Sequence, residues 1–257
     1  MNTVSVVIPC YNSESTIERA LRSVYEQTYT IHEIICIDDC STDSTTDIIS
    51  NLFPTVKIIK KNKNSGPAMS RNMGIKVATG DYIAFLDSDD FWLPQKTEVQ
   101  IKIMQDMLLD CIGSSFSVGM PLYEFRDYSV KIESIYSLLL RNKLPTPSVI
   151  IRNEGFYFSD DMKYSEDYDL WLRLAANKKR LAYVIEPLVC LGKESYGKAG
   201  LSANLFKMEY GELKAITKNT RDKYYLFFIF HVLSLVKFFK RLVKVSFLKT
   251  LAARKNN

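Results

Sequence analysis

Histidine and cysteine are scarce in this sequence, and their scarcity argues against several kinds of site. The chain has 257 residues, of which two are histidines and five are cysteines. His32 and His231 lie far apart and no Cys-x-x-Cys pair occurs, so we do not expect a zinc site. Five scattered cysteines are typical of reduced thiols in a cytosolic protein rather than of a disulfide framework.

Long apolar runs are also missing. No uninterrupted hydrophobic stretch approaches the roughly 20 residues that span a bilayer. The first residues, MNTVSVVIPCYN, have neither a charged segment nor a long apolar one, so we expect no signal peptide. The hydrophobic content of 47% is nevertheless ample for a core. The sequence therefore predicts a cytoplasmic protein with one large domain and an appendage.

Positive charge is concentrated at the end of the chain. The formal net charge is +5, but eleven Lys or Arg residues and one acid, Asp222, lie between Lys214 and the C-terminus. The rest of the chain is acidic on balance, and no nucleic-acid partner is expected. The basic character belongs to a C-terminal tail.

Strand-like and helix-like segments alternate four times in the first 110 residues. This alternation predicts a doubly wound α/β sheet with parallel strands, in which ligands bind beyond the carboxyl ends of the strands. Ser15 and Glu18 have the spacing of a capping box at the first helix. The predicted strands are 4–9, 33–38, 56–60 and 82–87, and the predicted helices that follow them begin near 15, 47, 66 and 95.

The pattern changes after residue 112. Residues 113–160 contain three prolines and read as irregular, apart from a helix at 134–140. An amphipathic helix is predicted at 166–176 and a last strand at 181–189. We expect a boundary near residue 200.

Polar clusters follow three of the predicted strands, at 9–12, 38–43 and 87–90. They should converge on one crevice, because the carboxyl ends of parallel strands meet at the same edge of a sheet. The carboxylates Asp87, Asp89 and Asp90 repel one another unless a positive charge lies among them or water solvates them.

Four segments occur in an order that resembles a known family: SVVIPCYN, DDCSTD, NSGPAMSRNMGIKVATGDYIAFLDSDDFWLP and SEDYDLWLRL. Together they resemble the inverting glycosyltransferases of family 2, over roughly residues 3–190. The resemblance implies a GT-A fold with a mixed sheet. It divides the chain into a nucleotide-sugar-binding half (1–112), an acceptor-binding and catalytic half (113–203) and a basic helical tail (204–257).

The resemblance places a divalent metal at Asp87 and Asp89. Two carboxylates suit Mn²⁺ or Mg²⁺, which prefer oxygen ligands and share them with substrate phosphates. The alternative is a solvated acidic turn, with Asp90 capping the next helix. Either aspartate of Asp38–Asp39 could contact uracil while the other caps a turn. The nucleotide-contacting residues that the resemblance implies are Pro9, Tyr11, Asn12, Glu14, Asp38, Asp39, Gly66, Arg71, Asp87, Ser88 and Asp89.

Glu166 and Asp167 open a predicted helix, where acids are common because of the helix dipole. The resemblance implies a catalytic role for this pair, with Asp167 as the general base of an inverting transfer. Arg173, six residues later, is expected to tie this helix to the domain. Residues 192–205 are predicted to form a lid or a plain linker, where Lys193, Lys198 or Ser202 could approach phosphate.

The tail contains an apolar run, 224–236, followed by basic residues at helical spacing. This pattern predicts peripheral attachment to the anionic cytoplasmic face of the inner membrane. The alternatives are a helix pair packed on the domain and a homodimer.

The resemblance then implies transfer from UDP-glucose or UDP-galactose to an undecaprenyl-diphosphate-linked sugar in O-antigen, capsule or exopolysaccharide synthesis. A non-catalytic UDP-sugar-binding or scaffolding module is the alternative function, and a nucleotidyltransferase a weaker one.

Overall fold

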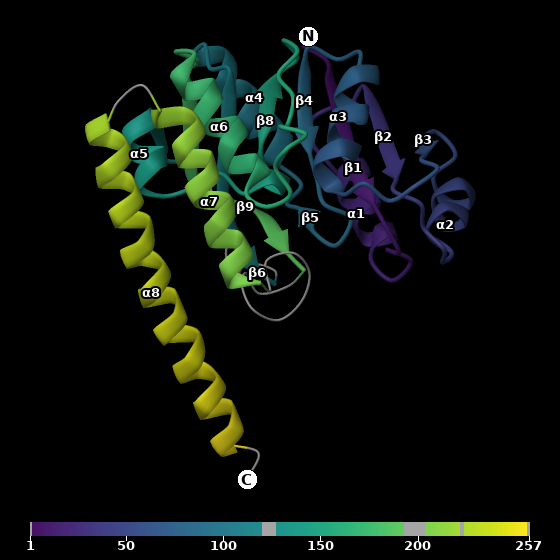
Figure 1. The fold of residues 1–257 in the computed structure, drawn as a ribbon. Helices are drawn as coiled ribbons and strands as arrows, with labels where there is room; N and C mark the ends of the chain where they lie inside the picture. Colours follow the sequence, from purple (N-terminus) through teal and green to yellow (C-terminus); the bar gives the residue numbers. More distant parts are fainter. Residues whose placement is uncertain (1, 120–126, 193–203, 222–223, 256–257) are drawn as a thin grey trace.

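The structure is a computed structural model that describes residues 2–119, 127–192, 204–221 and 224–255, with side chains described as far as Val243. Within these residues, nine strands form one mixed sheet, in the order β3-β2-β1-β4-β8-β6-β9-β5 with β7 paired to β9. Figure 1 shows this sheet at the centre of the molecule, with helices on both sides of it.

The first half of the sheet is parallel. β1 pairs with β2 and β4, and β2 pairs with β3, always in parallel. This half is built from strand–helix units, as the sequence predicts. Its strands are β1 (Val4–Cys10), β2 (Glu33–Asp38), β3 (Lys57–Lys60) and β4 (Tyr82–Phe85), and its helices are α1 (Ile17–Tyr25), α2 (Thr45–Leu52) and α3 (Pro67–Val77).

The second half makes the sheet mixed. β8 pairs antiparallel with β4 and with β6, whereas β6 runs parallel to β9. The prediction that residues 113–160 are irregular apart from one helix is therefore wrong in part, because β6 continues into this segment and β7 and β8 lie within it. The strands are β5 (Phe91–Trp92), β6 (Cys111–Val118), β7 (Val130–Glu133), β8 (Ile150–Arg152) and β9 (Leu181–Leu191), and the helical segments are α4 (Lys96–Asp106), α5 (Ile135–Leu140), η1 (Thr146–Ser148) and α6 (Glu166–Ala176).

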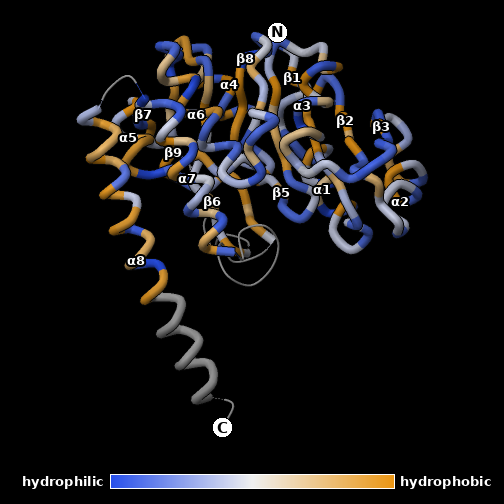
Figure 2. The backbone as a smooth tube through the Cα atoms, viewed as in Figure 1, coloured by the Kyte–Doolittle hydropathy of each residue, from blue (hydrophilic) through white to orange (hydrophobic). Residues whose placement is uncertain are grey.

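Two hydrophobic clusters form the core, one on each face of the sheet. In β1, Val6 and Ile8 belong to one cluster and Val7 belongs to the other. Because successive side chains of a strand point to opposite faces, a strand covered on both sides must be apolar throughout. The continuous apolar run of β1 is explained in this way, and Figure 2 shows hydrophobic residues along the central strands.

Two helices follow the sheet domain. α7 (Leu205–Thr220) packs on α6, and α8 (Tyr224–Lys255) runs back antiparallel along α7 (Figure 1). The contact with the segment before α6 is close, because a Cβ atom at Gly211 would lie 2.5 Å from the carbonyl oxygen of Tyr164. Over the part of the chain that the structure describes, none of the helices combines the length and apolarity needed to cross a membrane.

The predicted basic stripe of the tail is partly turned toward α7. Lys237 and Arg241 lie 2.9 and 3.6 Å from the carboxylate of Glu212, whereas Lys240 is exposed. Part of the stripe therefore packs within a helix pair. The opposite side of α8 exposes large apolar side chains, among them Phe228, Val232, Phe239 and Val243.

The predicted capping box of the first helix is wrong, and so is the alternative that Asp90 caps a helix. α1 begins at Ile17 without a side-chain cap, so Ser15 and Glu18 form no capping box; Glu18 instead pairs with Arg22 at 2.6 Å. Asp90 does not cap the next helix, because β5 intervenes before α4. Its carboxylate accepts a hydrogen bond from the backbone N–H of Gly192 at 2.9 Å.

Candidate active site

The loops after β1 and β2 are tied together by polar contacts. The side-chain oxygen of Asn12 accepts a hydrogen bond from the N–H of Thr42 at 2.8 Å, and the carboxylate of Glu14 accepts one from Ser44 at 3.1 Å. Asn12 has a φ of 47°, a left-handed conformation that asparagine tolerates. Pro9 is buried in β1, whereas Tyr11 is 49% exposed beside this loop. Tyr11 is therefore accessible to a ligand.

The two aspartates that follow β2 differ in their partners. Asp39 accepts hydrogen bonds from the N–H groups of Ser65 and Gly66 and pairs with Lys61 at 2.6 Å. Its carboxylate thus holds the chain at the start of α3, where Gly66 has a φ of 87°. The carboxylate of Asp38 accepts a hydrogen bond from its own turn, from the N–H of Ser41.

Arg71 joins two acids that lie far apart in the sequence. Its guanidinium contacts Asp87 at 2.6 Å and Glu166 at 3.1 Å, and the residue is only 4% exposed. It also lies over the ring of Phe158, and its Nε has no hydrogen-bond partner. Burial lowers the pKa of Arg71, but Asp87 and Glu166 outweigh burial and raise that pKa. Arg71, which lies in α3, therefore places a permanent positive charge beside the turn that follows β4.

The carboxylates of the acidic turn after β4 differ in their exposure to solvent. The side chain of Asp87 is 29% exposed, and Asp89 is also partly exposed. Asp90 is buried; this burial, followed by the charge of Asp87, raises its pKa to about 8. Ser88 lies 2.7 Å from the hydroxyl of Ser13, which links this turn to the loop after β1.

A divalent cation fits Asp87 and Asp89 only with help from a substrate. Among the described residues, no group of three or more His, Cys, Asp or Glu side chains could hold a metal ion. Two carboxylates are nevertheless enough for Mg²⁺ or Mn²⁺ when phosphates and water complete the shell. Both aspartates are accessible for that purpose, although Arg71 already neutralises one oxygen of Asp87.

The start of α6 brings the second pair of acids to the same place. Ser165 has a left-handed φ of 55°, and α6 begins directly after it. Glu166 turns inward to Arg71, and burial raises its pKa to about 7 against the opposing effect of Arg71. Asp167 accepts hydrogen bonds from Asn142 and Thr146 at 3.4 and 3.3 Å. Burial raises the pKa of Asp167 as well.

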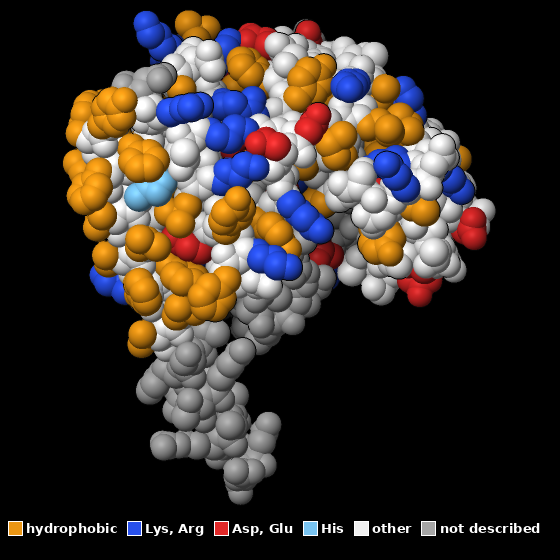
Figure 3. All heavy atoms as spheres, in the orientation of Figure 1, with side chains coloured by type: hydrophobic (Ala, Val, Ile, Leu, Met, Phe, Trp, Pro, Cys, Tyr) orange, Lys and Arg blue, Asp and Glu red, His pale blue; other side chains and the backbone are white. Residues whose placement is uncertain are grey.

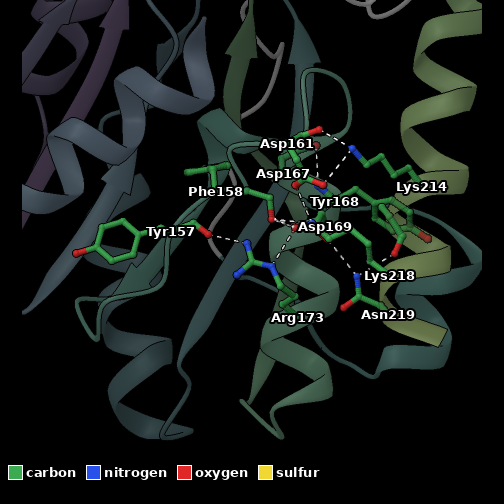
Figure 4. A network of polar contacts seen from close by, with 12 residues as sticks. Tyr157, Phe158, Asp161, Asp167, Tyr168, Asp169, Arg173, Lys214, Lys218 and Asn219 are labelled. Carbon is green, nitrogen blue, oxygen red and sulfur yellow. Dashed lines mark hydrogen bonds and ion pairs between the residues drawn. The ribbon is translucent and has the colours of Figure 1, made fainter. Parts of the chain in front are cut away.

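A second polar network fixes α6 against its surroundings (Figure 4). The fully buried Asp169 pairs with Arg173 at 2.9 Å, and Arg173 also donates to the carbonyl of Tyr157. The prediction that Arg173 ties this helix to the domain is confirmed. Asp161 lies nearby and pairs with Lys214 and Lys218 of α7.

Sequence reasoning missed the partners that orient these acids. The resemblance implied that Arg71 contacts the nucleotide, but its bridge to Glu166, which crosses 95 positions of sequence, was not predicted. Asn142 and Thr146 lie in the segment that seemed irregular. The predicted lid residues Lys193, Lys198 and Ser202 lie outside the described residues.

The model of the family described as glycosyl transferase family 2 matches residues 5–161. The chain belongs to this family. This glycosyltransferase is 31% identical over 249 residues to the UDP-Glc:alpha-D-GlcNAc-diphosphoundecaprenol beta-1,3-glucosyltransferase WfaP of Escherichia coli, a match that covers 92% of this chain and 96% of that protein.

Solved structures resemble this glycosyltransferase in fold. The structure of Staphylococcus aureus TarS 1–349 in complex with UDP-GlcNAc superposes with a TM-score of 0.65 at 20% identity, covering 84% of this chain and 66% of that one. The mannosyltransferase PcManGT from Pyrobaculum calidifontis, in complex with GDP-Man and Mn²⁺, gives 0.66 at 19% identity, covering 98% and 80%. The predicted family and the mixed GT-A fold are confirmed.

Proposed function

We propose that this enzyme transfers a hexose, from UDP-glucose or UDP-galactose, to an undecaprenyl-diphosphate-linked sugar with inversion at the anomeric carbon. Two similar proteins of Escherichia coli, WfaP and WfgD, are named as UDP-glucose-dependent transferases to such a lipid-linked acceptor. TarS has been solved with UDP and with UDP-GlcNAc. A bacterial O-antigen, capsule or exopolysaccharide is the product class that this acceptor implies.

The observation that supports the proposal best is the meeting of two acidic pairs at Arg71. This residue holds Asp87, at the end of β4, and Glu166, at the start of α6. Asp167 is next to Glu166 and has a raised pKa. A base thus lies near the turn that would hold the diphosphate of a donor.

In the proposed reaction, Asp167 accepts the proton of an acceptor hydroxyl as its oxygen attacks the anomeric carbon. The new C–O bond forms while the bond from this carbon to the β-phosphate oxygen breaks, and the electron pair leaves with UDP. An α-linked donor therefore gives a β-linked product without a covalent intermediate. Asn142 and Thr146 orient the carboxylate of Asp167.

Asp87 and Asp89 would hold Mn²⁺ or Mg²⁺, which neutralises charge that develops on a departing diphosphate. Arg71 holds Asp87 in place and adds a second positive charge at the same edge of the sheet. The carboxylate of Asp39 already binds N–H groups at the start of α3. Asp38 is therefore the candidate contact for the uracil of the donor, and the exposed ring of Tyr11 can pack against this uracil.

Replacement of the proposed base tests this mechanism. Asp167→Asn should lower kcat by about 10²- to 10⁴-fold, because an amide cannot accept the proton. Affinity for UDP should stay unchanged, as measured by calorimetry. The matched control is Asp47→Asn, an exposed acid in the first turn of α2, which should retain full transfer. Normal kcat in Asp167→Asn would remove the base assignment.

We also propose that α8 attaches the enzyme to the cytoplasmic face of the inner membrane. Large apolar side chains cover its outer surface, which is visible as a patch in Figure 3. Contiguous exposed apolar patches mark surfaces that meet a membrane or a protein. An acceptor carried on a lipid makes the membrane the favoured partner, with a homodimer as the alternative.

A further inference from the structure

An open pocket lies beside the start of α6, outside the set of acids described above. It has a volume of about 350 Å³ and lies between the segment before α6 and the first half of α7. Its lining combines basic and aromatic side chains. They include Lys163, Tyr164, Phe206, Lys207, Tyr210 and Lys214.

The pocket has an excess of positive charge. Its carboxylate, Asp161, is already paired with Lys214 at 3.0 Å and with Lys218 at 2.9 Å. Hydrogen bonds from these lysines lower the pKa of Asp161 to about 2, so this acid stays ionised and committed to them. No ion pair joins Lys163 or Lys207 to an acid within the described residues, and both are exposed. Two lysines thus remain to attract an anion.

The walls of the pocket are apolar and lead toward α8. Phe206 and Tyr210 are 69% and 70% exposed, so most of the surface of each side chain is open to a ligand. The ring of Phe206 packs against Phe238 of α8 with centroids 5.2 Å apart, and Phe239 is exposed next to it. An apolar surface therefore continues from the pocket to the outer face of α8.

The pocket is also close to the proposed base. Tyr164 lines it and lies three residues before Asp167, so their Cα atoms are at most about 11 Å apart. The hydroxyl of Ser165 donates to the carbonyl of Met208 at 3.3 Å, which fixes this segment against α7. One sugar ring and a diphosphate can span such a distance.

We propose that this pocket binds the diphosphate and the first isoprene units of the lipid-linked acceptor. Lys163 and Lys207 pair with phosphate oxygens, and Phe206 and Tyr210 pack against the hydrocarbon chain, which continues along α8. The inference rests on the proposed transfer to a polyprenyl-diphosphate-linked sugar and gives that acceptor a binding site. An anion attached to an apolar chain matches both the lysines and the aromatic walls.

Binding of farnesyl diphosphate to the full chain tests the proposal without catalysis. The measurement is made by calorimetry in excess EDTA, which prevents metal-mediated binding of the diphosphate at Asp87. The double variant Lys163→Glu/Lys207→Glu should bind at least about tenfold more weakly than the wild type. Lys102→Glu, an exposed lysine of α4, is the matched control and should bind normally.

A second variant examines the apolar wall. Tyr210→Ser should weaken binding of farnesyl diphosphate but leave binding of inorganic pyrophosphate unchanged. Equal affinity of the wild type for both probes would overturn the proposal, because the walls would then contribute nothing. Unchanged binding of farnesyl diphosphate by the double lysine variant would overturn it as well.

Two further measurements separate related explanations. If the double variant loses binding to phosphatidylglycerol vesicles but keeps farnesyl diphosphate, the lysines bind lipid headgroups and the proposal fails. In transfer assays, the double variant should raise the acceptor KM and leave the donor KM unchanged. Loss of farnesyl diphosphate binding in the variant, with no transfer by the wild type, would support the pocket and reject the proposed function.

Discussion

At the scale of single residues, Arg71 supplies a positive charge beside the acidic turn, in addition to the metal ion that the sequence predicted there. Its guanidinium is buried and forms one contact with Asp87 and another with Glu166. A planar fork can hold two carboxylates in a way that a lysine cannot. Arg71 therefore connects the turn after β4 to the start of α6, and a cation bound at Asp87 would share this carboxylate with it.

Removal of this guanidinium should destabilise the fold. At pH about 8, where Glu166 is ionised, Arg71→Met should lower the free energy of unfolding by about 3 kcal/mol, because it leaves this buried carboxylate without its partner. Arg22→Met breaks the exposed pair with Glu18 and should cost no more than about 1 kcal/mol. Urea unfolding of both variants gives the comparison. Equal stabilities would mean that the buried bridge has no structural role.

Glu166 should make stability depend on pH. Its pKa in the folded protein is about 7, above the ordinary value of 4.5, because burial favours the neutral acid. Its contribution to stability is therefore complete below pH 4.5 and is lost as the pH rises through 7. Glu166→Gln should remove this dependence, so the variant should gain stability relative to the wild type at higher pH. Urea unfolding at pH about 5 and about 8 measures the difference.

At the scale of elements, the sequence predicted the strands and helices whose own pattern is strong. β1 and α6 appear where they were expected, since one is buried on both faces and the other is amphipathic. β6 was missed because its sequence, CIGSSFSV, is rich in serine and carries no apolar run. Its strand conformation comes from pairing with β8 and β9, which lie far away in sequence.

The candidate site shows the same limit. The motifs identified Asp87, Asp89, Glu166 and Asp167, but the sequence could not show that Arg71 joins the two acidic pairs. The contacts of Arg71 depend on how α3 and α6 pack against each other. This packing is set by residues in both halves of the sheet, so the local spacing of a motif does not predict it.

The outer face of α8 supplies a test at this scale. Replacement of Phe228, Phe239 and Val243 by serine should abolish binding to phosphatidylglycerol vesicles, since these exposed side chains provide the apolar contact. Stability should change by less than about 0.5 kcal/mol per site, because none of them is buried. Leu52→Ser/Leu108→Ser, exposed elsewhere, should bind vesicles normally. Vesicle binding by the triple variant would favour the homodimer.

At the scale of the whole molecule, the site depends on both halves of the sheet domain. The parallel half provides the acidic turn after β4, and the mixed half provides α6 with its two acids. The family match ends at residue 161, before α6 begins. Because both halves build the site, binding of the nucleotide should stabilise the entire domain.

UDP with Mn²⁺ should raise the thermal stability of the protein. At a hundredfold excess over Kd, a ligand that binds only the folded state adds about 2.7 kcal/mol. Asp87→Ala should remove the part of this gain that depends on Mn²⁺, whereas Asp47→Ala should not. Thermal unfolding followed by fluorescence provides the measurement. A gain that survives in Asp87→Ala would place the metal elsewhere.

The close approach of α7 to the segment before α6 limits how this enzyme can be recombined with its relatives. Any side chain at position 211 would strike the carbonyl oxygen of Tyr164. Chimeras that exchange the C-terminal helices between related transferases therefore need a glycine at this position. C-terminal helices without this glycine would displace the segment that leads into Asp167, even if the outer surface of the helices suited the recipient enzyme.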